Sequence, residues 1–452
     1  PTGVFTDKTE KAHYTRKWDL QTAPSLCTLC GLGCNTLPGE RLGTLRRIRN
    51  RYHGEINRYF LCDRGRFGYG FVNSPRRIRH PVLRQTTTSQ KVIVSAERAI
   101  DHVAGLLAEG ATIGIGSPTA SLEANHALRS LVGAENFLVG IDAGEAEMLR
   151  IVVATLGAGP ARPPSLRDIE RADAVLILGE DPTNTAPMLD LAVRQSVLNV
   201  PLERARKLGV PHWNDAVNRL VVNNERGPLF VATPAPTALD KLASGVCRAA
   251  PEDIAHLGFA IAKIIDPGSP TPGDLPHRIA LLAGPVAEAL RKSTTPVIIT
   301  GTGSGTVATL QAAATLVRAL GAVNPGAALC LVVPDCNTVG VGLFGAHDLS
   351  HAAPAAARGE IANAIVLEPD LSRRGRNHAL TAVLDNVSHV VVLDHLDGPA
   401  TDRAELVLPA ATYAESGGTM VNNEGRAQRF FQVFVPEGEV RASWRWLQQI
   451  GE

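Results

Sequence analysis

The chain has 452 residues, and its 45 Lys and Arg against 44 Asp and Glu give a formal net charge of +1. Hydrophobic residues make up 44% of the sequence and charged residues 20%, which is ordinary for a globular protein and excludes a disordered polyampholyte, a collagen-like repeat and a coiled coil. The length exceeds that of one hydrophobic core and predicts about two to four domains. Because no run of about 18 apolar residues occurs, no transmembrane helix is predicted.

Four of the seven cysteines form a motif near the start of the chain, with two, three and then 27 residues between them. They are Cys27, Cys30, Cys34 and Cys62. Thiolates suit iron–sulfur clusters and zinc, and the close spacing lets one loop wrap a compact inorganic core that the fourth ligand closes. Zinc ribbons usually carry two matched Cys-x2-Cys halves, so the spacing favours a [4Fe–4S] cluster, with zinc as the alternative.

The residues around this motif suit an anionic cluster. Gly31 and Gly33 have no Cβ, which lets backbone N–H groups approach cluster sulfurs. Arg64 and Arg66 follow the fourth cysteine, where their charge would offset that of the cluster and raise its potential. An odd number of cysteines, crowded at one end, indicates a metal site in a reducing compartment rather than a disulfide framework. The other three lie in apolar stretches and are predicted core residues: Cys247, Cys330 and Cys336.

Charge is distributed unevenly along the chain. Residues 41–84 contain twelve arginines and two acids, a local charge of +10, and residues 1–40 are balanced, so residues 85–452 carry −9. Residues 1–84 also hold nine of the twenty aromatic residues. A basic, aromatic stretch has three possible interpretations: a nucleic-acid surface, a solvated face, or a basic surface that surrounds an anionic cluster and binds neighbouring subunits. No nucleic-acid reader motif accompanies the charge, so the third interpretation is favoured and nucleic acid is not expected as a partner.

From about residue 90 the sequence alternates short apolar runs with helical stretches. Buried strands are predicted at residues 112–115, 174–178, 297–300, 364–367 and 390–393. Helices are predicted over 121–132 and 187–197 and before Gly321, and the Pro- and Gly-rich stretch 267–276 is predicted to be a surface connection. Continuous apolar strands alternating with helices predict parallel sheets that are covered on both faces.

The motif and its neighbours resemble a known family. The cysteine motif followed by Asp63-Arg64-Gly65 is similar to the N-terminal cluster domain of the molybdopterin oxidoreductase superfamily. A closer resemblance is to the large peripheral-arm iron–sulfur subunits of bacterial respiratory complex I, NADH:quinone oxidoreductase. The stretches that carry it are PTGVFTDK, RKWD, CNTLPGERLGTLRRI, FLCDRGRFGYG and VNNEGRAQRFFQV. The resemblance covers essentially the whole chain.

This resemblance implies a division of the α/β fold. A small N-terminal [4Fe–4S]-binding domain, residues 1–84, would precede two doubly wound parallel-sheet domains. Residues 85–145 and 290–405 would form one of these, and residues 146–289 the other, inserted in it. Residues 406–452 would return to a degenerate cofactor cleft.

The resemblance also implies a function. The four cysteines would hold one [4Fe–4S] cluster with a mainly structural or assembly role, in a peripheral arm that transfers electrons from NADH to quinone. Pro1-Thr2-Gly3 resembles the end of a ferredoxin Cys-Pro motif, so further [2Fe–2S] and [4Fe–4S] clusters would lie before a fragment boundary at Pro1. The implied partners are the NADH/flavin-binding and quinone-module subunits, on the cytoplasmic face of the bacterial inner membrane. Contact with the membrane would be made only through these partners, and the fragment alone would be non-catalytic.

Molybdenum chemistry is not expected of this chain. Catalytic members of the superfamily carry a Cys, selenocysteine, Ser or Asp metal ligand before the turn that reads GEDP here, residues 179–182. The stretch VGIDAGEAEM has neither Cys nor Ser, and Asp142 is its one acid of a ligand type seen in relatives, although such an acid is more often solvated. A molybdopterin-dependent oxidoreductase such as a formate dehydrogenase stays the first alternative, and a zinc-bearing binding module the second.

Two further patterns have ordinary structural explanations. The turn at residues 301–305, GTGSG, follows a strand and opens a helix, as a phosphate loop does, but Thr306 breaks G-x-G-x-x-G and no Gly-Lys-Ser/Thr follows. A strand–turn–helix junction is predicted, with a vestigial pterin-phosphate contact as the alternative. Four histidines lack a metalloprotease-type arrangement and are predicted surface or capping residues: His347, His351, His389 and His395.

Overall fold

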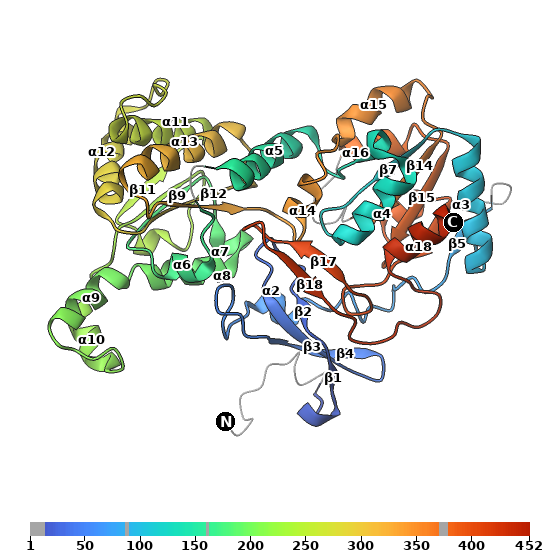
Figure 1. Ribbon diagram of the computed structural model, residues 1–452, viewed down its shortest axis with the longest axis horizontal. Helices are drawn as coiled ribbons and strands as arrows, with labels where there is room; N and C mark the ends of the chain where they lie inside the picture. Colours follow the sequence, from blue (N-terminus) through green and yellow to red (C-terminus); the bar gives the residue numbers. More distant parts are fainter. Residues whose placement is uncertain (1–13, 86–89, 160–161, 370–377) are drawn as a thin grey trace.

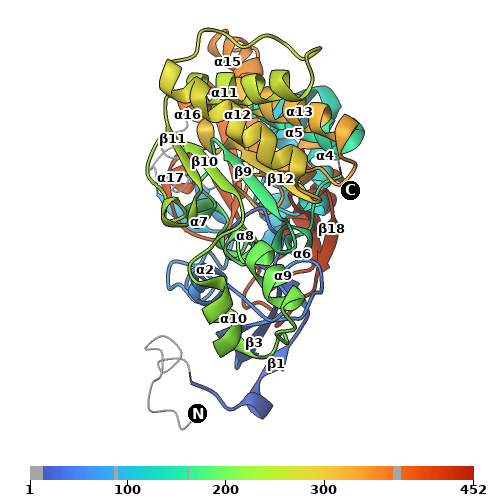
Figure 2. The same ribbon diagram turned by 90° about the vertical axis from the view of Figure 1, so that its left-hand side faces the viewer.

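The computed structural model describes residues 14–85, 90–159, 162–369 and 378–452. These residues form two α/β lobes side by side, with a smaller β-rich unit, drawn in blue, below them (Figure 1). In the view turned by 90°, helices cover both faces of the sheet in the nearer lobe (Figure 2). Each lobe is built on its own sheet, one of five strands and one of seven.

The N-terminal unit, residues 14–81, holds a four-stranded antiparallel sheet, one short α-helix and the 3₁₀ helix η1 Lys17–Asp19. β3 and β4 are joined by Leu42 and Gly43, whose φ angles of 55° and 74° are the pattern of a type I′ hairpin turn. The elements are β1 Gln21–Thr22, β2 Ser25–Leu26, β3 Asn35–Arg41, β4 Thr44–Asn50 and α2 Asp63–Phe67.

The first lobe holds the five-stranded sheet, in the order β11-β10-β9-β12-β13, with all pairs parallel. Every residue of β9, β12 and β13 is buried, because helices cover both faces. The strands are β9 Ala174–Leu178, β10 Leu229–Thr233, β11 Gly245–Arg248, β12 Pro296–Gly301 and β13 Ala328–Val332. The helices are α5 Ala143–Ala158, α6 Leu166–Glu170, α7 Pro182–Thr185, α8 Pro187–Ser196, α9 Asn199–Lys207, α10 Asp215–Val222, α11 Pro251–Ile265, α12 His277–Lys292 and α13 Val307–Val323.

The second lobe holds the seven-stranded sheet, in the order β6-β5-β16-β15-β14-β7-β8. The five strands from β16 to β8 in this order are parallel to one another. At the other edge, β5 and β6 form an antiparallel hairpin, and β5 pairs antiparallel with β16. The strands are β5 Val82–Arg84, β6 Lys91–Ile93, β7 Thr112–Ile115, β8 Phe137–Leu138, β14 Asn363–Leu367, β15 His389–Asp394 and β16 Leu406–Pro409. The remaining elements are α3 Ala96–Glu109, α4 Leu122–Val132, α14 Thr338–Gly342, α15 Leu349–Ala357, α16 His378–Leu384, α17 Pro399–Arg403, α18 Ser443–Gly451 and the hairpin β17 Gly418–Val421 with β18 Ala427–Phe430.

The predicted fold class is confirmed, and the predicted strands all form. The helix predicted over 121–132 is α4, which Ser121 caps by accepting a hydrogen bond from the N–H of Ala124. α13 runs past Gly321 to Val323, because the N–H of Asn324 still bonds the carbonyl of Leu320. The stretch 267–276 connects α11 to α12 as a largely exposed loop. None of the helices in the described ranges is long and apolar enough to cross a membrane.

The pairing of strands differs from the predicted division of the chain. β12 and β13, which lie beyond the predicted boundary at residue 290, belong to the five-stranded sheet, because β12 pairs with β9. β5, within predicted residues 1–84, and β16, within predicted residues 406–452, pair with each other in the seven-stranded sheet. The strand–helix units resemble one another in sequence. The sheet that each unit joins is decided by pairing with strands that are distant along the chain, so the sequence pattern does not indicate it. The other boundaries stay predictions.

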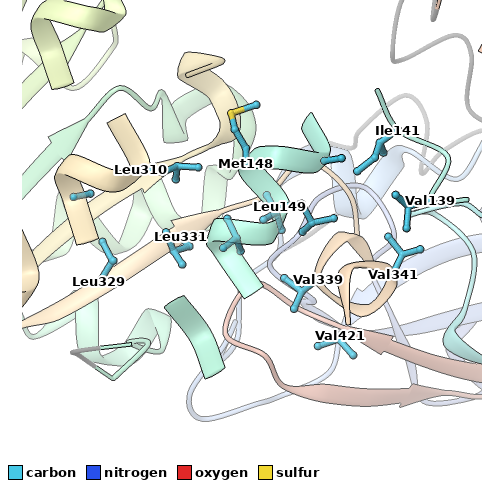
Figure 3. Packing of buried hydrophobic residues seen from close by; sticks show 14 of the residues in the cluster. Val139, Ile141, Met148, Leu149, Leu310, Leu329, Leu331, Val339, Val341 and Val421 are labelled. Carbon is cyan, nitrogen blue, oxygen red and sulfur yellow. The ribbon is translucent and has the colours of Figure 1, made fainter. Parts of the chain in front are cut away.

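One hydrophobic core runs from lobe to lobe. Met148 and Leu149 of α5 lie between Leu331 of β13 on one side and Val339 and Val341 of α14 on the other (Figure 3). α5 and α14 are the two crossings between the sheets, so the packed crossings fix the lobes against one another.

A buried ion pair joins the end of the N-terminal unit to the loop before β17. The guanidinium of Arg77 donates to both carboxylate oxygens of Glu415, at 3.1 and 2.6 Å, and both side chains are almost wholly buried. The N–H and hydroxyl of Thr412 also donate to Glu415, each at 2.9 Å. Arg77 further donates to the carbonyls of Val72 and His395, each at 3.0 Å.

Glu415→Gln is expected to lower the free energy of unfolding by about 3–5 kcal/mol, because it leaves the Arg77 charge buried without a counter-charge. Urea denaturation followed by circular dichroism measures the loss. Glu437→Gln is the matched control, since it removes an exposed partner of Arg79 and should cost about 1 kcal/mol or less. Equal losses in the two variants would contradict a dominant role for the buried pair.

Candidate metal centre

Three segments place the four predicted cysteine ligands. Cys27 follows β2, Cys30 and Cys34 lie in the loop that leads to β3, and Cys62 is the N-cap residue of α2. The N–H of Cys27 donates to the carbonyl of Cys34 at 2.8 Å, which closes the loop on itself. The thiol of Cys62 accepts the N–H of Gly65 at 3.5 Å.

The thiols of Cys30 and Cys62 lie close enough to Cys27 and Cys34 to affect the ionisation of these two cysteines. Burial raises the pKa of Cys27 to about 12, and the neighbouring Cys30 and Cys62 contribute to this rise. Burial and then Cys30, Cys27 and Cys62 likewise raise the pKa of Cys34. Buried thiolates at this proximity repel each other, so a core that carries positive charge must accompany their ionisation.

Zinc and a four-iron cluster would space four thiolates differently. Within the described ranges, no group of three or more His, Cys, Asp or Glu side chains is arranged to hold a single metal ion. A zinc ion draws four thiolates tightly together, because its Zn–S bonds are only about 2.3 Å long. A four-iron cluster keeps its four thiolates further apart, since the inorganic core lies between them.

Gly65 allows two of the sulfurs to approach α2. A Cβ at this position would lie 3.3 Å from the Sγ of Cys27 and 3.8 Å from the Sγ of Cys62. The sequence interpretation assigned no role to Gly65. In the sequence Gly65 stands three residues after Cys62, within the stretch Asp63-Arg64-Gly65 that carries part of the family resemblance.

The two glycines of the loop pack closely against other parts of the molecule, and the predicted approach of their N–H groups to cluster sulfurs stays a prediction. A Cβ on Gly31 would lie 2.6 Å from the carbonyl oxygen of Val333, just after β13. Gly33 has a φ of 66°, and a Cβ there would lie 2.5 Å from the Nε2 of Gln428. These glycines let the loop pack tightly against the rest of the molecule.

The hairpin of β17 and β18 holds the backbone of this loop. The N–H of Asn423 donates to the carbonyl of Gly31 at 2.8 Å, and the side-chain amide of Asn422 donates to that of Leu32 at 3.2 Å. The amide of Gln428 donates to the carbonyl of Gly33 at 3.0 Å. The stretch VNNEGRAQ, which carried part of the family resemblance, therefore supports the cysteine loop, a role that sequence reasoning did not assign.

The two predicted arginines differ in position. The guanidinium of Arg64 donates to the carbonyls of Asn184 and Thr185 in α7, at 2.8 and 3.3 Å, and its charge lowers the pKa of Cys27 against the larger effects that raise it. Arg66 is half-buried on the same helix. Its guanidinium makes no hydrogen bond or ion pair with any described residue, so Arg64 is the arginine that the structure brings to the thiols.

Tyr413 lies near Cys27, and both line one small cavity. Burial raises the pKa of its hydroxyl, and Cys27 and Tyr69 add to this effect. The hydroxyl of Tyr69 donates to the carbonyl of Arg46 at 2.8 Å. Sequence reasoning assigned neither tyrosine to the site. Tyr413 could not be assigned because it is distant in sequence from the cysteine motif.

The glycine turn after β12 is filled by the protein itself. The carboxylate of Glu180 accepts the N–H of Gly303 at 3.1 Å, the N–H of Asp181 at 3.0 Å and the hydroxyl of Thr185 at 2.9 Å. Burial raises the pKa of Glu180. A carboxylate thus occupies the position that a bound phosphate would need, and the turn forms the predicted strand–turn–helix junction.

The remaining candidates have structural partners. Asp142 caps α5 by accepting the N–H of Glu145 at 2.8 Å. His389 pairs with Glu405 at 2.5 Å, and its side chain is 37% exposed. His395 is partly buried, with its ring 5.4 Å from that of Phe71. The rings of His347 and His351 stack at 3.7 Å. The three other cysteines are buried, as predicted: Cys247, Cys330 and Cys336.

Comparisons with known proteins agree with this geometry. The family model of the molybdopterin oxidoreductase Fe4S4 domain matches residues 20–74, and that of molybdopterin oxidoreductase matches residues 269–452. These two matches cover the segment that holds the four cysteines and about the last two fifths of the chain.

Over its whole length the chain is similar to the G subunit of NADH-quinone oxidoreductase. It is 45% identical to the protein of that name from Pseudomonas fluorescens and 43% identical to that from Escherichia coli K12, with 100% of the chain aligned to 50% of each relative. The chain therefore spans about half the length of the curated relatives that it matches.

Two solved structures share the fold. Acetylene hydratase from Pelobacter acetylenicus aligns with a TM-score of 0.65 at 12% identity, over 95% of this chain and 68% of that one. The formyltransferase/hydrolase complex from Methylorubrum extorquens aligns with a TM-score of 0.55 at 17% identity, over 82% of this chain and 97% of that one. At these identities the likeness concerns the fold alone.

Gly65→Ala is expected to reduce the iron content of the purified chain to less than half of the native value. The new Cβ would lie 3.3 Å from the Sγ of Cys27, and a sulfur held by a cluster cannot move aside. Because alanine favours a helix over glycine by about 1 kcal/mol, weakening of α2 would not explain the loss.

Iron and acid-labile sulfide per chain, measured after anaerobic purification, check this expectation. Gly70→Ala is the matched control, since nothing lies within 4 Å of its Cβ position. Native iron content in Gly65→Ala would show that the sulfurs do not need this space.

Proposed function

We propose that the chain carries one [4Fe–4S] cluster on Cys27, Cys30, Cys34 and Cys62, with Arg64 and Arg66 as nearby charges. The observation that carries the proposal is that the fold gathers the four cysteines of a segment matching an Fe4S4 domain, where Cys30 and Cys62 lie close enough to raise the pKa of Cys27 and Cys34. When bound, such a cluster supplies one-electron redox capacity and the positive iron core that balances four thiolates.

We propose further that the chain is the iron–sulfur part of an NADH:quinone oxidoreductase, and that its cluster has mainly a structural or assembly role. The names and identities of the relatives support the first statement. Contacts of the cysteine loop and α2 with the first lobe support the second: Gly31 packs on Val333, and Arg64 donates to α7. A cluster at this junction would hold the N-terminal unit, the hairpin and the first lobe together.

The proposed partners are the NADH/flavin-binding and quinone-module subunits of a peripheral arm. The exposed, basic face of the N-terminal unit supports docking, since Tyr52 and Tyr59 are exposed there with ring centroids 4.8 Å apart. In this proposal the arm lies on the cytoplasmic face of the bacterial inner membrane, with membrane contact through partners. Further [2Fe–2S] and [4Fe–4S] clusters would belong to regions of the full protein outside this sequence.

The proposal includes no molybdopterin and no NADH oxidation by this chain alone. Anaerobic purification followed by analysis of iron, sulfide, zinc and molybdenum tests it. We expect about four irons and four sulfides per chain without molybdenum. Stoichiometric molybdenum would favour a molybdopterin-dependent oxidoreductase, and one zinc without sulfide would favour a binding module.

Cys62→Ser is expected to abolish the broad brown absorbance of the native cluster, because it removes the ligand that α2 contributes. Visible absorption and iron content after anaerobic purification check this. Cys247→Ser is the matched control, as it replaces a buried cysteine of the five-stranded sheet without changing the proposed ligands. An unchanged spectrum in Cys62→Ser would refute the ligand set.

A further inference from the structure

Two buried hydroxyls lie opposite each other in the sheet that leads into the cysteine loop. Ser25 of β2 is 0% exposed and Thr36 of β3 is 1% exposed. The two residues are direct partners in an antiparallel pair, so their side chains lie on the same face of the sheet. Neither hydroxyl makes a hydrogen bond with any described residue. Because a buried hydroxyl without a hydrogen bond costs free energy, a partner of another kind is expected.

The position of Thr36 relates its hydroxyl to the proposed ligands. Thr36, Cys27 and Gly65 line the same small cavity. A Cβ on Gly65 would lie 3.3 Å from the Sγ of Cys27 and 3.8 Å from the Sγ of Cys62, so the cavity adjoins two of the four thiols. Ser25 is not among the residues that line this cavity, which makes Thr36 the closer candidate.

The other hydroxyls of the cavity have partners elsewhere or open on a larger space. They belong to Thr28, Tyr69 and Tyr413. The hydroxyl of Tyr69 donates to the carbonyl of Arg46 at 2.8 Å. Thr28 and Tyr413 also line a separate cleft with a volume of about 440 Å³, where further partners can reach them. Thr36 does not line that cleft, so its hydroxyl is enclosed on the side of the cysteines.

An iron–sulfur cluster offers this hydroxyl an acceptor. A threonine hydroxyl has one O–H donor, and the sulfurs of an anionic cluster accept hydrogen bonds. The hydroxyl of Thr36 makes no hydrogen bond with the thiol of Cys27, so an inorganic sulfide of the cluster is the acceptor that remains. A buried water molecule is the ordinary alternative partner for such a group.

We propose that the hydroxyl of Thr36 donates a hydrogen bond to a cluster sulfide beside Cys27 and thereby raises the reduction potential of the cluster. Reduction adds negative charge to the sulfurs, so a donor stabilises the reduced cluster more than the oxidised one. This inference rests on the proposed [4Fe–4S] cluster. It assigns a function to a residue outside the four cysteines and the two arginines.

Thr36→Val tests the proposal, because valine has nearly the shape of threonine but no hydroxyl. The full chain, purified anaerobically, is titrated with reductant while electron paramagnetic resonance measures the reduced cluster. At a fixed ambient potential, we expect the ratio of reduced to oxidised cluster to fall at least about threefold. This fall corresponds to about 28 mV, at about 59 mV per tenfold change for one electron. Thr36→Ser keeps the hydroxyl and should restore the native ratio.

Thr233→Val is the matched control, since it replaces a buried threonine of β10 in the five-stranded sheet and should leave the ratio unchanged. Circular dichroism and iron content check that each variant folds and holds its cluster. If Thr36→Val fails either check, Thr36→Ala, which also lacks the hydroxyl, takes its place. A native ratio in the variant without the hydroxyl, as expected for a water partner, would overturn the proposal. So would a lowered ratio that Thr36→Ser does not restore.

Iron and sulfide content of the native chain separates this outcome from failure of the proposed cluster. A native chain without about four irons and four sulfides refutes the cluster, and the role of Thr36 with it. A native chain that holds the cluster, but whose ratio does not respond to loss of the hydroxyl, refutes the role of Thr36 alone.

Discussion

Burial of several thiols next to one another is the constraint on which the N-terminal unit depends. Cys27, Cys30 and Cys34 are each less than 10% exposed, and the pKa of Cys27 rises to about 12. Ionising them in that environment costs free energy through desolvation and mutual repulsion. An inorganic core with positive charge removes both costs, which ties formation of the metal site to folding of the loop around it.

Contacts from several other parts of the molecule hold the cysteine loop in place. The hairpin of β17 and β18 bonds its backbone through Asn423 and Gln428, while Arg64 attaches α2 to the first lobe. The buried pair of Arg77 and Glu415 joins the end of the N-terminal unit to the segment before the hairpin. The site therefore lies at a junction of three parts of the chain, which suits a structural or assembly role.

The α/β class could be predicted from sequence because its signals are local: continuous apolar runs identify strands such as β9 and β14. Cysteine spacing is a local signal too, and the four ligands that it predicts stay a prediction. The supporting residues could not be predicted, because Asn422 and Gln428 lie almost 400 residues from the loop that they hold. β12 belongs to the five-stranded sheet because it pairs with β9, and no local sequence pattern indicates this pairing. The role of Gly31 likewise depends on Val333, a contact that only the folded chain reveals.

Mössbauer spectroscopy of the chain, produced with ⁵⁷Fe and purified anaerobically, tests most directly whether the four cysteines hold one cluster. We expect all the iron to have tetrahedral sulfur coordination and to be magnetically coupled in a single diamagnetic [4Fe–4S]²⁺ centre, with that signal lost in Cys62→Ser. Isolated iron ions, or iron with nitrogen and oxygen ligands in place of the coupled centre, would contradict it.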